Sequence, residues 1–207
     1  MKAIVSIKNV TKKFKDKKIF DNFSVDIFEG ECVAIVGVSG SGKTTLLNMI
    51  GGLEKIDEGS IFVKDVKVVK NNYVKLHRNI VSFLFQNFAL VDEWTVEKNL
   101  LLALSFRNKK EQIMTLENAL EKVGLADKLK TKVYQLSDGE QQRVALARLM
   151  LQNKPIVLAD EPTASLDTEN RNVVFSILKK LQSDGKTIII VTHDRELANQ
   201  CDKIVEI

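Results

Sequence analysis

The chain has 207 residues, of which 44% are hydrophobic and 28% charged, as expected for one large α/β domain and unlike a disordered chain. No apolar run approaches the roughly 18–20 residues that span a bilayer, and early lysines interrupt any signal-peptide core, so we expect a cytosolic protein or one held at a membrane by a partner. With two cysteines and two histidines, neither a disulfide framework nor a clustered metal site is expected, and Cys32 and Cys201 are predicted to be reduced thiols.

The net charge of +4 comes with a concentration of lysine near the N-terminus. Such a patch can bind nucleic acid or anionic lipid, or it can be a solvated hairpin loop near a nucleotide site. The second interpretation is favoured because the run lacks an interleaved aromatic stacking surface, and no nucleic-acid partner is expected. The lysines concerned are Lys8, Lys12, Lys13, Lys15, Lys17 and Lys18.

The N-terminal third predicts antiparallel structure. Polar and apolar residues alternate over 23–27, which is typical of a half-buried strand, and this strand is expected to end at Gly30. Residues 3–7 are expected to pair with it, and short strands are predicted at 60–63 and 66–69. Together these segments predict an N-terminal antiparallel β subdomain.

The apolar runs that follow are longer and alternate with helical segments. Helices are predicted at 44–50 and from Asp167 to about Gly185. This alternation favours an α/β fold with a mostly parallel sheet whose faces are covered. The predicted buried strands lie at 31–36, 80–85, 156–160 and 186–192.

Residues 87–152 are helical in character. Thr95 is a candidate helix cap, residues 111–123 predict a helix that stops at Gly124, and another helix is predicted from about Ser137 to Gln152. We therefore expect the whole chain, 1–207, to form one domain in which a helical subdomain is inserted into the α/β core.

Residues 37–44, Gly-Val-Ser-Gly-Ser-Gly-Lys-Thr, match the phosphate-loop pattern G-x-x-x-x-G-K-[ST]. The match stands between a predicted buried strand and a predicted helix, where backbone N–H groups and the helix dipole form an anion cradle. A glycine-rich turn without a ligand is the competing interpretation, and the strand–loop–helix context disfavours it. The candidate phosphate-binding residues are Gly37, Val38, Ser39, Gly40, Ser41, Gly42, Lys43, Thr44 and Thr45.

Two acidic residues stand at the end of the predicted strand at 156–160. Asp160 is predicted to hold Mg²⁺ together with the hydroxyl of Thr44, as phosphate-loop enzymes require. Glu161 is placed to orient and polarise an attacking water. A plain surface turn before Pro162 is the alternative, but ligands bind at the carboxyl ends of strands in open α/β sheets.

Two further candidates depend less on local pattern. His193 follows the predicted strand at 186–192 and could reach the γ-phosphate, although a lone histidine is more often structural. Ser137 and Glu140 match the capping box S-x-x-E, and a helix start with a serine and a glycine can equally bind an anion.

The order of these segments resembles the nucleotide-binding subunit of an ABC transporter, and the resemblance covers essentially the whole chain. It is carried by residues 37–44 as Walker A, Gln86 as the Q-loop glutamine, 136–140 as the signature motif, 158–161 as the end of Walker B with the catalytic glutamate, 165–167 as the D-loop, His193 as the switch histidine and Phe14 as the aromatic that stacks on adenine.

The resemblance implies a phosphate-loop ATPase with ATP and Mg²⁺ as cofactors, in which two subunits sandwich two ATP molecules head to tail. Ser137 and Gly139 would bind the γ-phosphate held by the opposite subunit, and Asp167 would couple the two sites. Gln86 would contact the metal and the water and report to a membrane partner. Lys43 and the loop amides would bind the β- and γ-phosphates. Glu161 would activate the water, and His193 would hold the γ-phosphate.

The signature segment departs from the usual LSGGQ at two positions. Asp138 stands where glycine is usual, and Glu140 where glutamine is commonest. A carboxylate pointing at the nucleotide would repel it, whereas one pointing outward on the first helical turn would favour the helix dipole. The second arrangement is the preferred interpretation for Asp138.

Residues 51–53 and 85–90 resemble the bacterial MacB/LolD-like group, and within it small ATPases linked to bacteriocin or antimicrobial peptide export. This implies a separate membrane permease, a position on the cytoplasmic face of the membrane, and a peptide or lipid-like cargo. Phe88, Leu90 and Trp94 could line the groove that receives a helix of that permease, or could belong to the core, and the sequence leaves both open.

Two other functions compete with transport. An ATP-gated clamp or regulator would normally carry coiled-coil or zinc insertions, which are not visible here. A phosphate-loop nucleotide kinase would need an acceptor site and gives no reason for the segment at 136–140.

Overall fold

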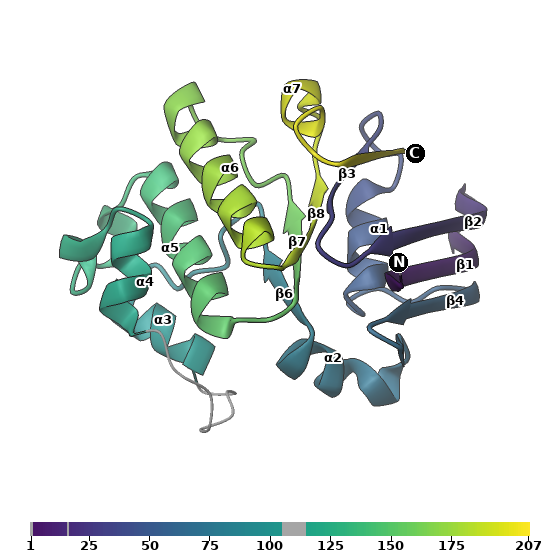
Figure 1. Ribbon diagram of the computed structural model, residues 1–207, viewed down its shortest axis with the longest axis horizontal. Helices are drawn as coiled ribbons and strands as arrows, with labels where there is room; N and C mark the ends of the chain where they lie inside the picture. The colour runs from purple at the N-terminus through teal and green to yellow at the C-terminus, as the bar shows by residue number, and fades with distance from the viewer. Residues whose placement is uncertain (1, 16, 105–114) are drawn as a thin grey trace.

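The computed structural model describes residues 2–15, 17–104 and 115–207, and its strands form two sheets (Figure 1). The strands are β1 (Ala3–Phe14), β2 (Lys17–Phe28), β3 (Cys32–Val36), β4 (Glu58–Val63), β5 (Val66–Lys67), β6 (Val81–Leu84), β7 (Ile156–Asp160), β8 (Thr187–Val191) and β9 (Lys203–Glu206). The antiparallel sheet has the order β2-β1-β4-β5, and the second sheet has the order β6-β7-β8-β3-β9.

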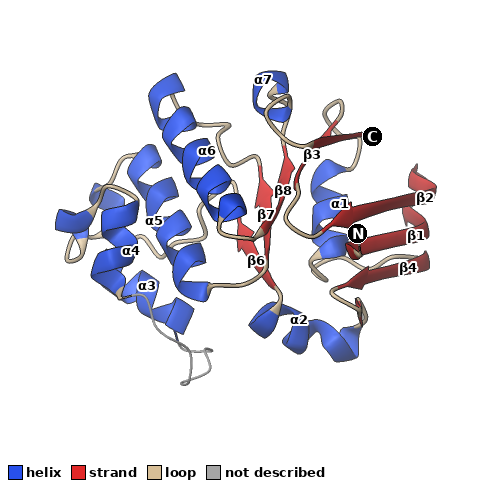
Figure 2. Cartoon of the chain, viewed as in Figure 1, coloured by secondary structure: helices blue, strands red, loops and turns tan. Residues whose placement is uncertain are grey.

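Helices pack around the second sheet (Figure 2). In the described residues they are α1 (Lys43–Ile50), α2 (Tyr73–Asn79), α3 (Val96–Leu104), α4 (Leu116–Lys122), α5 (Asp138–Gln152), α6 (Thr168–Ser183) and α7 (Arg195–Ala198). The α/β class and the combination of an antiparallel and a mostly parallel sheet are therefore confirmed.

The five-stranded sheet is parallel at every pairing. All residues of β3 and β8 are buried, which explains why these strands are continuous apolar runs rather than alternating ones. Because β7, β8 and β3 are neighbours and run in one direction, the residues that follow them meet at one edge of the sheet. This edge brings together the phosphate loop, Asp160 and His193.

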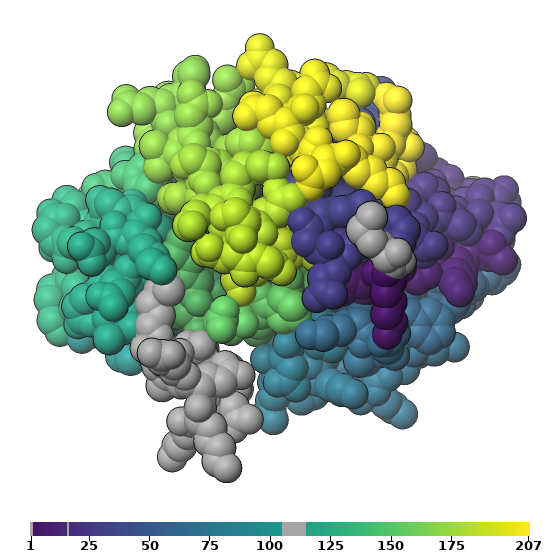
Figure 3. Space-filling view, viewed as in Figure 1, coloured from purple at the N-terminus to yellow at the C-terminus, as the bar shows by residue number. Residues whose placement is uncertain are grey.

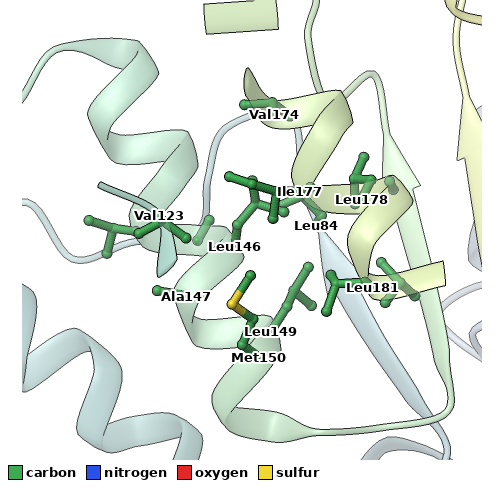
Figure 4. Packing of buried hydrophobic residues seen from close by; sticks show 14 of the residues in the cluster. Leu84, Val123, Leu146, Ala147, Leu149, Met150, Val174, Ile177, Leu178 and Leu181 are labelled. Atoms are coloured by element: carbon green, nitrogen blue, oxygen red, sulfur yellow. The ribbon is translucent and has the colours of Figure 1, made fainter. Parts of the chain in front are cut away.

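Two apolar clusters hold the layers together. One lies between the parallel sheet and the helices α3 to α6, where Leu146 and Leu149 of α5 pack near Ile177 and Leu181 of α6 (Figure 4). The other joins α1, the parallel sheet and the inner face of the antiparallel sheet. The helices of residues 87–152 gather beside the sheet on the side away from β1 and β2 (Figure 1), and the existence of a separate subdomain there stays a prediction.

The N-terminal hairpin is longer than its sequence pattern predicts. β1 and β2 have 12 residues each, and their register shifts at several points along the pairing. Most of the N-terminal lysines lie in the strands of the hairpin rather than in a loop, so the prediction of a loop is wrong for them, whereas the prediction of solvated side chains is confirmed for all of these except Lys12. They are Lys8, Lys12, Lys13, Lys17 and Lys18. Lys12 is even buried, with 5% of its surface exposed.

A second correction concerns the helix predicted at 111–123. The helix begins at Leu116, because Thr115 has an extended backbone and its side chain caps the amide of Asn118. Residues 111–114 lie outside the described part of the chain. The helix ends at Lys122, and Gly124 follows with a positive φ of 70°, as the stop signal predicts.

Three elements have no strong pattern in the sequence and were not predicted: α2, α7 and β9. The short strand β9 pairs in parallel with β3 at the edge of the sheet. Figure 3 shows the C-terminal segment (yellow) lying against the N-terminal strands (purple and blue) on this face of the molecule. At the end of β9, the amide of Ile207 donates to the carbonyl of Val36, just before the phosphate loop.

Cys32 is a buried free thiol, as predicted, and Cys201 is also free; their sulfur atoms lie 3.3 Å apart. Within the described residues, no helix has the length and apolar character needed to cross a membrane.

Candidate active site

The phosphate loop follows β3 and leads directly into α1. The Nζ of Lys43 donates to the carbonyl oxygens of Gly37 and Val38, at 2.9 and 3.0 Å. An ammonium carries three N–H donors, so one of them is left for a ligand. Ser41 Oγ is buried and makes no hydrogen bond to any described residue. A buried polar atom without a partner is costly, and a bound phosphate oxygen would satisfy it.

Gly42 must be a glycine at this position. Its φ is +106°, and a Cβ built on it would lie 2.4 Å from Cγ2 of Ile19 and 3.1 Å from the ring of Phe20. The close approach shows that β2 packs directly on the phosphate loop. The antiparallel hairpin is therefore part of the wall of the site.

A hydroxyl and a carboxylate meet at the start of α1. Thr44 Oγ1 donates to Asp160 Oδ1 at 2.9 Å, as the prediction of a shared metal site requires. Burial raises the pKa of Asp160, because it disfavours the ionised carboxylate. A bound cation would stabilise that ionised form. Hydroxyl and carboxylate oxygens are ligands that Mg²⁺ prefers, so this pair fits the ion.

Glu161 and His193 form the second polar pair of the site. His193 Nδ1 lies 3.0 Å from Glu161 Oε2, and the side chain of Glu161 is 16% exposed whereas that of His193 is 68% exposed. Glu161 has a positive φ of 45°, and its amide donates to the carbonyl of Val191 in β8. This backbone turn carries the carboxylate from β7 toward the end of β8.

A cavity of about 390 Å³ lies over the phosphate loop. It contains predicted residues from every part of the sheet edge together with Ile19 and Ala164, which were not predicted. Its lining residues are Phe14, Ile19, Ser39, Gly40, Gly42, Lys43, Thr44, Thr45, Gln86, Glu161, Ala164 and His193. The structure thus gathers most of the candidate phosphate, metal and catalytic residues around one space. Asp160 does not line it and is connected to it through the hydrogen bond from Thr44, and Gly37, Val38 and Ser41 also lie outside the lining.

Ser137, Gly139 and Asp167 are not among the residues that line this cavity. Ser137 caps α5 in a complete capping box with Glu140, which confirms that local prediction. The backbone hydrogen bond from Ser137 holds the pKa of Glu140 below its usual value. Asp138 is exposed on the first turn of α5, next to the exposed Ser137, and its outward orientation relative to a nucleotide on a second subunit stays a prediction.

Gly139 and Asp167 are nevertheless brought close together by Asn170. A Cβ built on Gly139 would lie 2.5 Å from Asn170 Oδ1, so a larger residue there would displace the Asn170 side chain. Asn170 also bonds to both carboxylate oxygens of Asp167, through its amide at 2.8 Å and its side chain at 2.9 Å. Arg143 donates to Asn170 Oδ1 from α5. The segment at 136–140 and the segment at 165–167 therefore share one surface.

Phe88 and Leu90 are partly buried and pack against the apolar cluster around α5. Arg148 of α5 donates to the backbone carbonyl oxygens of Phe88 and Ala89, which ties this segment to α5. This packing favours the core interpretation for Phe88 and Leu90, and contact with a permease helix stays a prediction.

A strand, a phosphate loop, a helix and a strand-end acid pair, arranged in this way, define a phosphate-loop nucleoside triphosphatase. The family model described as "ABC transporter" matches residues 20–164. The chain therefore belongs to the ABC transporter family and is its ATP-binding, ATP-hydrolysing subunit.

Two relatives and one solved structure place the chain within the family. It is 38% identical to the lipoprotein-releasing system ATP-binding protein LolD of Francisella tularensis over 98% of this chain and 92% of that protein. It is 38% identical to the macrolide export ATP-binding/permease protein MacB of Campylobacter jejuni, over 99% of this chain and 33% of that protein. It also superposes on a dimeric ATP-binding cassette in a post-hydrolysis state bound to ADP and Pi, with a TM-score of 0.86, 37% identity, and coverage of 98% of this chain and 94% of that one. The predicted LolD/MacB type is confirmed.

Proposed function

We propose that two copies of this chain close head to tail around two ATP molecules and thereby drive a separate membrane permease from the cytoplasmic face of the membrane. Two observations support this arrangement: Ser137 is exposed, and neither Ser137 nor Gly139 lines the chain's own cavity. A second subunit is then needed to bring this surface to the phosphates.

We further propose the division of roles within the cavity. Lys43 and the loop amides hold the β- and γ-phosphates, while Thr44 and Asp160, with Gln86, hold Mg²⁺, which neutralises developing charge on the phosphates when bound. Glu161 accepts a proton from the attacking water, and His193 donates to the γ-phosphate. The observation that carries this proposal is the meeting of Thr44 with Asp160 beside the cavity that Glu161 and His193 line.

The test compares the chain with its Glu161→Gln variant in an assay of free phosphate release without any added acceptor. The variant should bind ATP with unchanged affinity and lose turnover by on the order of 10²–10⁴-fold, since the amide accepts no proton. Turnover at the unchanged rate would remove Glu161 from the reaction. Phosphate transfer only on addition of a second nucleotide would indicate a kinase.

The permease is proposed to dock on a groove between β6 and the helices α3 and α5. Cavities of about 300 and 310 Å³ share His77, Leu102, Ala103, Gln152 and Lys154 there, and the exposed side chains of Leu53 and Leu102 make the groove partly apolar. Phe85 lines this groove while the next residue, Gln86, lines the nucleotide cavity. A helix that binds in the groove would therefore contact Phe85, the residue directly before the proposed metal ligand Gln86.

Cargo is proposed to be peptide or lipid-like, as the LolD and MacB relatives are named for lipoprotein release and macrolide export.

The proposed permease groove is tested with a Leu102→Glu variant. This variant should keep its phosphate-release rate as an isolated subunit and lose its recovery with the membrane fraction of cells. Membrane recovery equal to that of the unmodified chain would place the permease contact elsewhere.

A further inference from the structure

Lys12 is an unusual residue for a strand of a solvent-facing hairpin. Among the described residues, Lys12 and Lys43 are the charged side chains that are buried. Burying an ammonium is unfavourable unless it is paired and hydrogen-bonded. Lys43 belongs to the phosphate loop, so a comparable reason is needed for Lys12.

The ammonium of Lys12 is paired on one side and covers an aromatic ring on the other. Its Nζ lies 2.7 Å from Glu54 Oε1 and 3.9 Å from Asp57 Oδ1. The same Nζ lies 4.6 Å from the centroid of the Phe14 ring. Residues two apart in a strand share a face, so the extended backbone of β1 places Lys12 beneath Phe14.

Glu54 and Asp57 belong to the segment that follows α1, the helix of the phosphate loop. The hairpin is tied to this segment by backbone as well, because Asp57 N donates to Thr11 O at 3.1 Å and Lys13 N donates to Asp57 Oδ2 at 2.6 Å. On the other strand, β2 packs on Gly42. The part of the hairpin that carries Phe14 is thus fixed relative to the phosphate loop.

Phe14 itself is 45% exposed and lines the nucleotide cavity, while Lys12 is not among the lining residues. The cation therefore covers the ring from outside the cavity, and the exposed part of the ring is left for a ligand. A cation held against one face draws on the ring's negative quadrupole, which makes the opposite face a better partner for an electron-rich purine.

We infer that Lys12 is a positioning residue of the nucleotide site, which holds Phe14 at a fixed height over the phosphate loop and tunes its ring for stacking on the base of ATP. This inference rests on the proposed function and on the role that the family resemblance implies for Phe14, which is to stack on adenine. Lys12 should therefore affect binding of the adenine base and leave binding of the triphosphate unchanged.

The test measures dissociation constants of ATP and of inorganic tripolyphosphate, both with Mg²⁺, for four proteins: the unmodified chain, Lys12→Met, Phe14→Ala and the double variant. Lys12→Met should raise the dissociation constant of ATP by about three- to tenfold, within the range of a cation–π contact, and leave that of tripolyphosphate unchanged. In the Phe14→Ala background it should add nothing.

Two further variants serve as controls. Lys12→Arg keeps a cation that reaches the same carboxylates, so it should restore most of the ATP affinity, and Lys13→Met on the opposite face of β1 should match the unmodified chain. If Lys12→Met does not fold, Glu54→Gln, which weakens the anchor and keeps the cation, should show the same selective loss for ATP in smaller measure.

The outcomes separate the inference from the proposed function. If Phe14→Ala weakens ATP binding and Lys12→Met does not, the inference is overturned while base stacking stands. If Phe14→Ala changes nothing, the stacking role fails and the inference fails with it. Equal weakening of ATP and tripolyphosphate by Lys12→Met, or an effect that persists without Phe14, would make Lys12 a residue of the fold alone.

Discussion

Thr44 Oγ1 donates a 2.9 Å hydrogen bond to Asp160 Oδ1, although the two residues are 116 positions apart in the chain. The contact joins the first turn of α1 to the end of β7, which are held together by the burial of both elements in the same apolar cluster. The two oxygen atoms are the proposed ligands of Mg²⁺ at the end of the parallel sheet.

The first prediction concerns this pair. Thr44→Val and Asp160→Asn each remove an oxygen ligand or its charge, so each should weaken the contribution of Mg²⁺ to ATP affinity by at least about tenfold. The measurement is the ratio of ATP dissociation constants with Mg²⁺ and with a chelator. Because the two groups act on one ion, the double variant should lose less than the sum of the single losses. An unchanged ratio in either variant would contradict the metal assignment.

A second prediction separates the two histidines. His193→Ala should lower kcat for ATP hydrolysis by on the order of 10²-fold, because it removes the partner of Glu161 and a donor in the cavity. His77 bonds through Nε2 to the carbonyl of Gly51 at 2.7 Å, away from that cavity. His77→Ala should therefore lower the thermal midpoint and leave kcat of the folded protein within about twofold, and the reverse pattern would refute the roles given to both.

A third prediction concerns the signature segment. Gly139→Ala places a methyl group 2.5 Å from Asn170 Oδ1, so the Asn170 side chain must move and its hydrogen bonds to Asp167 and Arg143 are disturbed. We expect weaker dimer formation with ATP, by about tenfold or more, and unchanged ATP binding to the monomer. Asp138→Gly is the matched control at an exposed neighbour and should change dimer formation by less than about threefold. A larger effect of Asp138→Gly would mean that its carboxylate faces the nucleotide.

A fourth prediction follows from the two thiols. The thiol of Cys32 donates a hydrogen bond to Cys201 Sγ, which lowers the pKa of Cys201 and raises that of Cys32. The thiolate is the reactive form, so alkylation of Cys201 should begin at a lower pH than that of an ordinary thiol. Buried Cys32 should stay unlabelled.

Mass spectrometry after iodoacetamide treatment at a series of pH values reads both sites separately. Cys32→Ala removes the donor, so the labelling midpoint of Cys201 should move to higher pH. A midpoint that stays in place would mean that the sulfur contact does not control its ionisation.

The parts of the fold that could be predicted are those where one physical requirement acts on a short segment. A buried parallel strand must be apolar throughout, so Ile156–Asp160 is found with its predicted bounds. A capping box satisfies two amides locally, so the start of α5 is also found. The phosphate loop could be predicted because its fixed glycines follow a strand that is apolar throughout.

The parts that could not be predicted depend on partners distant in the sequence. β9 has 4 residues and is a strand because β3 offers it an edge. The burial of Lys12 requires Glu54, which lies 42 positions away. The only local sign was the spacing of two between Lys12 and the aromatic Phe14, which places them on one face of a strand. Asn170 was missed for the same reason, since its contact with Gly139 joins two helices.

The most direct test of ATP-driven closure is the solution mass of the Glu161→Gln variant, measured by light scattering with and without ATP and Mg²⁺. Slowed hydrolysis should trap the closed state, so we expect a monomer of 23.3 kDa without nucleotide and a dimer with it. A monomer under both conditions, at concentrations where ATP is shown to be bound, would contradict a sandwich formed by two copies of this chain.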